Sequence, residues 1–220
     1  MAKLFTFDLH GVLEKGNEET VLKISNIALE SLSYKKRFTM EDIDFLYGEF
    51  WINYFRHLLP DLRELEYKSL QNKCHEIAML NPKIIKDNTQ PNDHAYFVLE
   101  EIKKRGHSQI VISRISNGGL EFFLSSIDMS GYFPKGSYFA VGDNKDDSFV
   151  TKNDILRNFL DIRKEGFDDI IIVGDSDSDM ALKSVAGGTT YLYLHPWRKP
   201  KKCEADHHIR DLRDILKEIN

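Results

Sequence analysis

The chain has 220 residues, of which 41% are hydrophobic and 30% are charged, and its formal net charge is −5. This composition is typical of globular proteins, and the length allows one or two domains. Proteins that bind the phosphate backbone of nucleic acids are more often basic, so the net negative charge argues against nucleic acid as a partner. No apolar run approaches the roughly 18 residues of a membrane helix, so we do not expect a membrane as a partner either.

Five short apolar runs predict buried strands, with helical periodicity between most of them. The predicted strands are Leu4–Phe7, Gln109–Ile112, Tyr138–Val141, Asp169–Val173 and Thr190–Leu194. The predicted helices are Asn92–Arg105, Lys152–Lys164, Asp177–Val185 and a final one at about His208–Ile219. Strands that alternate with helices predict an α/β fold, here a Rossmann-like three-layer core with a parallel sheet.

About 100 residues separate the first predicted strand from the second, far more than an ordinary crossover needs. Within them, apolar residues recur at helical spacing in Val21–Leu32, Ile43–Leu59 and Leu62–Leu80. We therefore expect an all-helical cap domain of residues 17–86, inserted into a core domain of residues 1–16 and 87–220.

Polar residues follow three of the predicted strands. Asp8 follows the first strand, Ser113 and Arg114 follow the second, and Asp175 follows the fourth. Ligands of open parallel sheets bind beyond the carboxyl ends of the strands, so we expect these residues to converge there.

These residue types suit phosphoryl transfer. A carboxylate such as Asp8 can attack phosphorus, and Mg²⁺ is commonly held by one or two carboxylates, here Asp8 and Asp175. The hydroxyl of Ser113 can donate to a phosphoryl oxygen. Lys152, at the start of the helix before the fourth strand, can balance the negative charge, with Lys145 as the alternative.

Gly11 lies three residues after Asp8, in the turn that follows the first strand. A glycine allows close backbone approach and can leave amide donors free around a phosphate. We therefore expect Gly11, with Ser113 and Arg114, to contact the phosphate of a substrate.

Four segments carry a resemblance to the haloacid dehalogenase superfamily. Residues 8–13, Asp-Leu-His-Gly-Val-Leu, resemble its first motif, and Ser113 after an apolar strand resembles the second. Lys152 resembles the third motif, and residues 174–179, Gly-Asp-Ser-Asp-Ser-Asp, resemble the fourth. The resemblance covers everything outside the predicted cap.

The resemblance implies a magnesium-dependent hydrolase, most simply a phosphatase of small soluble phosphate esters. Asp8 would be the covalent nucleophile, and His10 would lend its backbone carbonyl to the metal. Asp175 and Asp179 would complete the metal site, and Lys152 would assist catalysis.

His10 departs from the family pattern, because phosphatases of the family usually carry an aspartate at this position as the general acid and base. A histidine titrates near pH 6.5 and can perform the same proton transfers. Alternatively, His10 only fills space and offers its carbonyl. The departure also leaves two other functions open, a hydrolase of non-phosphate substrates such as a dehalogenase, and a non-catalytic protein that binds a phosphorylated ligand or a protein partner.

The compartment is suggested by two features. Cys74 and Cys203 are the only cysteines, which does not suggest a disulfide framework, and the apolar N-terminal stretch is interrupted by Asp8 and His10, unlike a secretion signal. We expect a cytoplasmic protein, and the sequence leaves its oligomeric state open.

A basic run of residues near the C-terminal end of the sequence is interpreted as a solvated loop. Its members are Arg198, Lys199, Lys201 and Lys202.

Overall fold

A computed structural model describes residues 2–142, 150–163, 166–196, 198 and 203–219 of the chain. It divides into two compact units, one of Met1–Glu14 with Pro91–Asn220 and the other of Lys15–Gln90. The chain passes between the units through β2 (Glu14–Lys15) and β3 (Gln90–Pro91), and these two short strands pair with each other.

The first unit is built on a six-stranded sheet in the order β5-β4-β1-β6-β7-β8, with every neighbouring pair parallel. Its strands are β1 (Leu4–Phe7), β4 (Ser108–Ser113), β5 (Tyr138–Ala140), β6 (Ile170–Gly174), β7 (Thr189–Tyr193) and β8 (His207–Ile209). The sheet confirms the predicted Rossmann-like α/β core.

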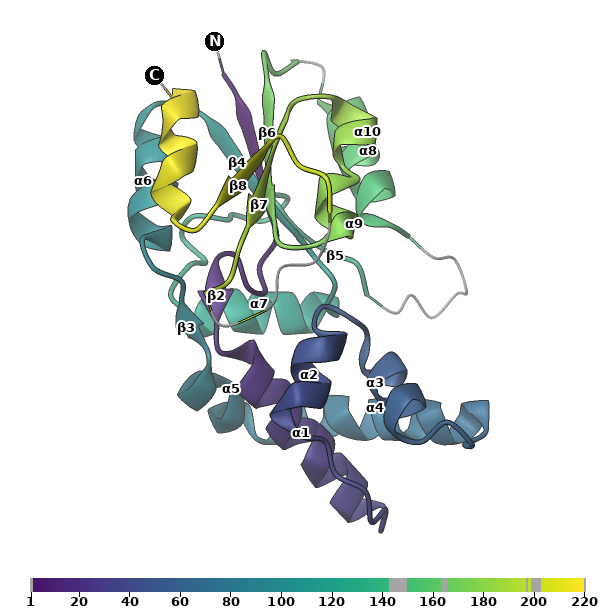
Figure 1. Cartoon of the computed structure of the whole chain (residues 1–220). Helices are drawn as coiled ribbons and strands as arrows, with labels where there is room; N and C mark the ends of the chain where they lie inside the picture. The colour runs from purple at the N-terminus through teal and green to yellow at the C-terminus, as the bar shows by residue number, and fades with distance from the viewer. Residues whose placement is uncertain (1, 143–149, 164–165, 197, 199–202, 220) are drawn as a thin grey trace. The chain divides into compact units, whose positions relative to one another are not determined.

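Helices cover both faces of this sheet (Figure 1). One face carries α6 (Ala95–Lys104) and the 3-10 helix η1 (Leu212–Ile219), and the other carries α8 (Lys152–Ile162), α9 (Asp177–Met180) and α10 (Lys183–Ala186). A further helix, α7 (Asn117–Ser126), contacts β5. The sheet is thus the middle layer of three.

The core of the first unit follows from the alternation of side chains along the strands. Leu4, Ile170 and Ile172 lie on the sheet face that packs against Leu156 and Phe159 of α8. Phe5 and Phe7 alternate with Leu4 along β1 and so lie on its other face, where they are buried and stack with ring centroids 6.5 Å apart. β1 is therefore buried on both faces and paired on both edges, and Asp8 directly follows it.

The C-terminal part of this unit differs from the prediction. The final helix expected from about His208 begins only at Leu212, because His207–Ile209 pair with β7 as β8. The helix expected over Asp177–Val185 is divided into α9 and α10, and α7 was not predicted.

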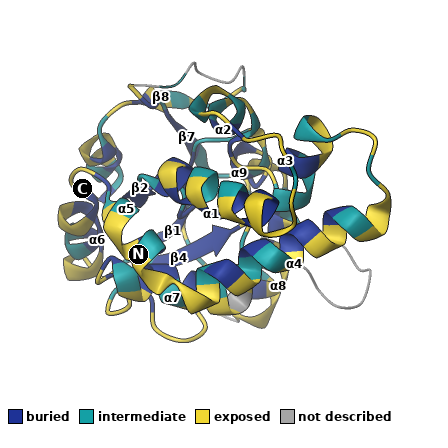
Figure 2. Cartoon of the chain, turned by 90° about the horizontal axis from the view of Figure 1, so that it is seen from below, coloured by how far each residue is buried: buried dark blue, intermediate teal, exposed yellow. Residues whose placement is uncertain are grey.

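The second unit is all-helical. It comprises α1 (Asn17–Ser31), α2 (Met40–Leu46), α3 (Trp51–Leu58), α4 (Glu64–Leu80) and α5 (Pro82–Asn88). Helix α1 contacts α2, α4 and α5, and both α1 and α4 carry buried and exposed residues, as amphipathic helices do (Figure 2). The periodic stretch Ile43–Leu59 forms two helices, because a turn at Gly48, where φ is 86°, separates α2 from α3.

In the part of the chain that the structure describes, no helix combines the length and apolar character needed to cross a bilayer.

Candidate active site

The carboxyl ends of four adjacent strands hold the polar residues of the site. Asp8 directly follows β1, Ser113 ends β4, Asp175 directly follows β6, and His195 lies two residues beyond β7. In the sheet these strands are neighbours in the order β4-β1-β6-β7. The strand order changes direction at β1, and such a switch point is where open α/β sheets bind ligands.

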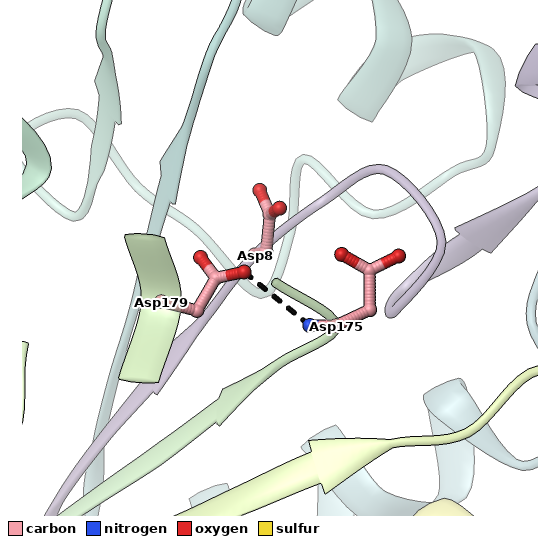
Figure 3. Close-up of side chains that lie close together, drawn as sticks. All are labelled: Asp8, Asp175 and Asp179. Carbon is pink, nitrogen blue, oxygen red and sulfur yellow. Dashed lines mark hydrogen bonds between the residues drawn. The ribbon is translucent and has the colours of Figure 1, made fainter. Parts of the chain in front are cut away.

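Three carboxylates meet at this edge. Asp8, Asp175 and Asp179 each offer one oxygen, and the three oxygens lie within 4.8 Å of one another (Figure 3). Asp8 and Asp179 are buried and Asp175 is largely buried. Carboxylates held this close repel one another unless cations or protons compensate their charge.

Lys152 supplies one such cation. Its Nζ lies 3.0 Å from Oδ1 of Asp8 and 2.6 Å from Oδ1 of Asp179, and only 3% of its side chain is exposed. Burial lowers the pKa of Lys152, but the charges of Asp179 and Asp8 outweigh this effect and hold the pKa above its usual value. Lys152 is therefore the charged partner of the nucleophile predicted from the sequence. The alternative, Lys145, lies outside the described residues.

A capping box fixes the start of the helix that carries Lys152. The side chain of Thr151 accepts a hydrogen bond from the backbone N–H of Asp154, and the side chain of Asp154 accepts one from the N–H of Thr151. This reciprocal pair satisfies donors that the first turn would otherwise leave unpaired.

Asp179 is held by donors on both oxygens. In addition to Lys152 on Oδ1, its Oδ2 accepts hydrogen bonds from Oγ of Ser176 at 2.6 Å and from two backbone N–H groups, one of them that of Asp175 (Figure 3). A Cβ on Gly174 would lie 2.1 Å from Cβ of Asp179, so glycine is required there. Burial raises the pKa of Asp179, Lys152 opposes this shift, and the net direction is upward.

Asp8 has one oxygen held and one available. Oδ1 accepts a hydrogen bond of 2.8 Å from the N–H of Leu9 and also faces Lys152. Oδ2 accepts no hydrogen bond from any residue that the structure describes. The contacts on Oδ1 fix the plane of the carboxylate and leave the second oxygen for a ligand.

His10 is paired with a residue that the sequence did not single out. Its Nδ1 lies 2.6 Å from Oε1 of Glu14, whose side chain is completely buried, and its ring packs edge-on against Phe123 at 4.8 Å. Burial lowers the pKa of His10, but the hydrogen bond and charge of Glu14 and the charge of Asp8 prevail and raise it. The only signal in the sequence for this pairing is that Glu14 lies four residues after His10.

Asp175 has two further partners that the sequence did not identify. Nε2 of His195 donates to Oδ2 of Asp175 at 2.8 Å, and Nη1 of Arg198 lies 3.5 Å from the same oxygen. The interpretation of Arg198 as part of a solvated loop is wrong, because only 8% of its side chain is exposed. The rest of that run, Lys199, Lys201 and Lys202, lies outside the described residues.

Gly11 lets the turn after β1 approach Asp175 and His195 closely, but its backbone N–H is already used within the protein. Its φ of 81° favours glycine, and a Cβ there would lie 2.5 Å from Oδ2 of Asp175 and 2.9 Å from Cε1 of His195. Its N–H donates to the backbone oxygen of Glu14 at 3.0 Å. The expectation that this amide is free for a phosphate is therefore wrong, because the turn after β1 uses it.

Ser113 is the last residue of β4, the strand beside β1, and Arg114 directly follows it. The hydroxyl of Ser113 is buried and has no hydrogen-bond partner among the described residues, whereas Arg114 is exposed. An unpaired buried hydroxyl costs about 1–3 kcal/mol. A ligand that accepted a hydrogen bond from Ser113 would recover that free energy.

The family described as haloacid dehalogenase-like hydrolase matches residues 5–190. Among curated proteins, no sequence matches the chain.

Several solved structures resemble the chain over nearly its full length. A predicted phosphoglycolate phosphatase from Haemophilus somnus has a TM-score of 0.81 and 18% identity, and the match covers 100% of this chain and 98% of that one. A predicted phosphatase from Clostridium acetobutylicum has a TM-score of 0.77 and 16% identity, with 100% and 98% covered. CbbY from Rhodobacter sphaeroides, solved in complex with phosphate, has a TM-score of 0.76 and 14% identity, with 98% and 96% covered. At these identities the likeness shows a shared fold.

Proposed function

Because the chain belongs to the family of haloacid dehalogenase-like hydrolases, we propose that it is a magnesium-dependent phosphatase of small phosphate esters. In the proposed reaction, Asp8 attacks the phosphorus of the ester and an aspartyl-phosphate forms as the alcohol leaves. Water then hydrolyses the aspartyl-phosphate and releases inorganic phosphate.

The observation that carries this proposal is the state of the Asp8 carboxylate. Two donors hold one of its oxygens, and the other oxygen has no donor among the described residues. A nucleophilic carboxylate needs this combination of fixed orientation and an available oxygen. The ammonium of Lys152, 3.0 Å from Oδ1, offsets part of the negative charge around the attacking carboxylate.

The donor set suits Mg²⁺, which prefers oxygen ligands and usually takes one or two carboxylates from a protein. Asp8 and Asp175 each have an oxygen without a described donor, and we propose that they hold the ion with the backbone carbonyl of His10. Asp179 adds negative charge, although donors already hold both of its oxygens. When bound, the ion would neutralise charge on the phosphoryl oxygens.

We assign the substrate phosphate to the edge of the sheet formed by β1 and β4. The buried hydroxyl of Ser113 would donate to one phosphoryl oxygen, and Lys152 would balance charge that develops near Asp8. Arg114, which is exposed and directly follows β4, stays a predicted phosphate contact.

We propose that His10 performs the proton transfers. Since Glu14 accepts the hydrogen on Nδ1, Nε2 is the ring nitrogen left to exchange a proton with the leaving oxygen and then with water. A carboxylate that fixes one tautomer of a histidine is a recurrent way to prepare a general base. The pairing with Glu14 supports this role over that of a space-filling residue.

A substrate panel tests the proposed function. The full chain is assayed with small phosphomonoesters and with a 2-haloacid, each with Mg²⁺ and with excess chelator. We expect phosphate release that requires Mg²⁺, no halide release, and a higher Mg²⁺ requirement for Asp175→Asn. Full turnover of phosphoesters in chelator would contradict the metal dependence, and halide release would favour the dehalogenase alternative.

A further inference from the structure

The two carboxylate oxygens of Asp175 have different surroundings. Oδ2 accepts the Nε2 hydrogen of His195 at 2.8 Å and faces Nη1 of Arg198 at 3.5 Å, while Oδ1 has no hydrogen-bond partner in the described part of the chain. Only 6% of the Asp175 side chain is exposed, so water contributes little to orienting it. Its orientation therefore depends on the groups that contact Oδ2.

His195 is itself built into the site. Its side chain is 5% exposed, and its ring packs edge-on against Tyr193 at 5.2 Å. The turn after β1 approaches closely enough that only glycine fits at position 11, where a Cβ would lie 2.9 Å from Cε1 of His195. Three segments, after β1, β6 and β7, thus fix the imidazole and the carboxylate together.

We propose that His195 is a positioning residue that holds Oδ2 of Asp175 and so presents Oδ1 to Mg²⁺. The proposal rests on the proposed magnesium site and adds to it a residue that touches neither metal nor substrate. Groups that orient a metal ligand through a hydrogen bond commonly change metal affinity by about 10- to 100-fold when removed. Arg198 adds a positive charge beside the same oxygen, so Oδ2 is satisfied twice by the protein.

Binding of Mg²⁺ alone to the full chain, measured by isothermal titration calorimetry without substrate, tests this proposal. His195→Phe keeps a ring but removes the donor, whereas His195→Gln keeps an N–H donor. We expect His195→Phe to weaken Mg²⁺ binding by roughly 10- to 100-fold and His195→Gln to retain most of the affinity. His208→Ala, at an exposed histidine of β8, is the control and should bind as the unaltered chain does.

The possible results distinguish a failure of this inference from a failure of the proposed magnesium site. If His195→Phe binds Mg²⁺ as tightly as the unaltered chain, or if His195→Gln binds more weakly than His195→Phe, the donor has no role and the inference is overturned while the metal site stands. If the unaltered chain does not bind Mg²⁺, the proposed function fails and the inference fails with it. Circular dichroism of each variant in chelator confirms that the fold is intact.

Discussion

At the scale of single residues, the proposed nucleophile is the most direct target. Asp8→Asn removes the attacking charge but keeps the shape of the side chain and the possible hydrogen bond from Leu9. We expect turnover of phosphoesters to fall by roughly 10⁴-fold or more, as when other nucleophiles are removed. Acid-quenched mass spectrometry should find one added phosphoryl group on the unaltered chain and none on the variant. Phosphorylation of Asp8→Asn would place the nucleophile elsewhere.

The pair of His10 and Glu14 predicts a specific kinetic defect. His10→Ala should slow hydrolysis of the aspartyl-phosphate by roughly 10²–10⁴, so that phosphoenzyme accumulates. Glu14→Gln should give a smaller defect of the same kind, because it removes the charge that orients the ring but leaves the ring in place. Single-turnover kinetics with an aryl phosphate, whose leaving group needs no proton, separates the two half-reactions. Unchanged turnover of His10→Ala across the pH range would contradict the role of His10.

The residues that the sequence predicted and those that it missed differ in how they reach the site. Asp8 and Asp175 follow apolar runs directly, so the rule for strand ends is enough to find them. His195 and Arg198 reach Asp175 from a different loop, and Glu14 meets His10 through the shape of the turn after β1. Both kinds of contact depend on backbone geometry that the residue pattern does not specify.

At the scale of elements, β8 is joined to its neighbour through Asp206, which precedes it. The carboxylate accepts hydrogen bonds from the N–H of Thr190 at 2.9 Å, from its hydroxyl at 2.8 Å and from Lys183. The ammonium of Lys183, followed by the donors of Thr190, holds the pKa of Asp206 well below its usual range.

This low pKa predicts how stability depends on pH. Since the unfolded-state pKa of aspartate is near 3.9, the ionised carboxylate stabilises the fold above about pH 4, and the stabilisation is lost as the pH falls through the folded-state pKa. Because 36% of the side chain is exposed, we expect Asp206→Asn to lower the free energy of unfolding by only about 1 kcal/mol at pH 7. Urea titrations at pH 7 and pH 3 should show this difference shrinking in acid. Asp161→Asn, at an exposed position of α8, is the control. An equal difference at both pH values would contradict the assignment.

The elements that the sequence predicted well are the long or strongly apolar ones. β1, β4, β6 and β7 are rich in apolar and β-branched residues and are almost entirely buried, and α8 has a clear apolar face and a capping box. β8 has three residues, two of them histidines, and its pairing with β7 overrides the helical pattern that was expected there.

At the scale of the whole molecule, the expectation that residues 17–86 act as a cap has a consequence for substrate size. A cap that closes during turnover excludes water and also excludes substrates too large to be enclosed. We therefore expect measurable turnover of small phosphate esters and none of a folded phosphoprotein. Phosphate release from both substrates, assayed at equal phosphate concentration, tests the expectation, and comparable rates would show that no such enclosure occurs.

The central place of β1 in the sheet constrains how the protein folds. Leu4 pairs with Ser108 on one side and with Ile170 on the other, so both neighbours of β1 come from segments far along the chain. Contacts so distant along the chain slow folding, because the loop between them must close before the pairing stabilises anything. Until then, the apolar strand Leu4–Phe7 has both hydrogen-bonding edges open to other nascent chains. The yield of refolded protein is therefore expected to fall as the concentration of the chain rises.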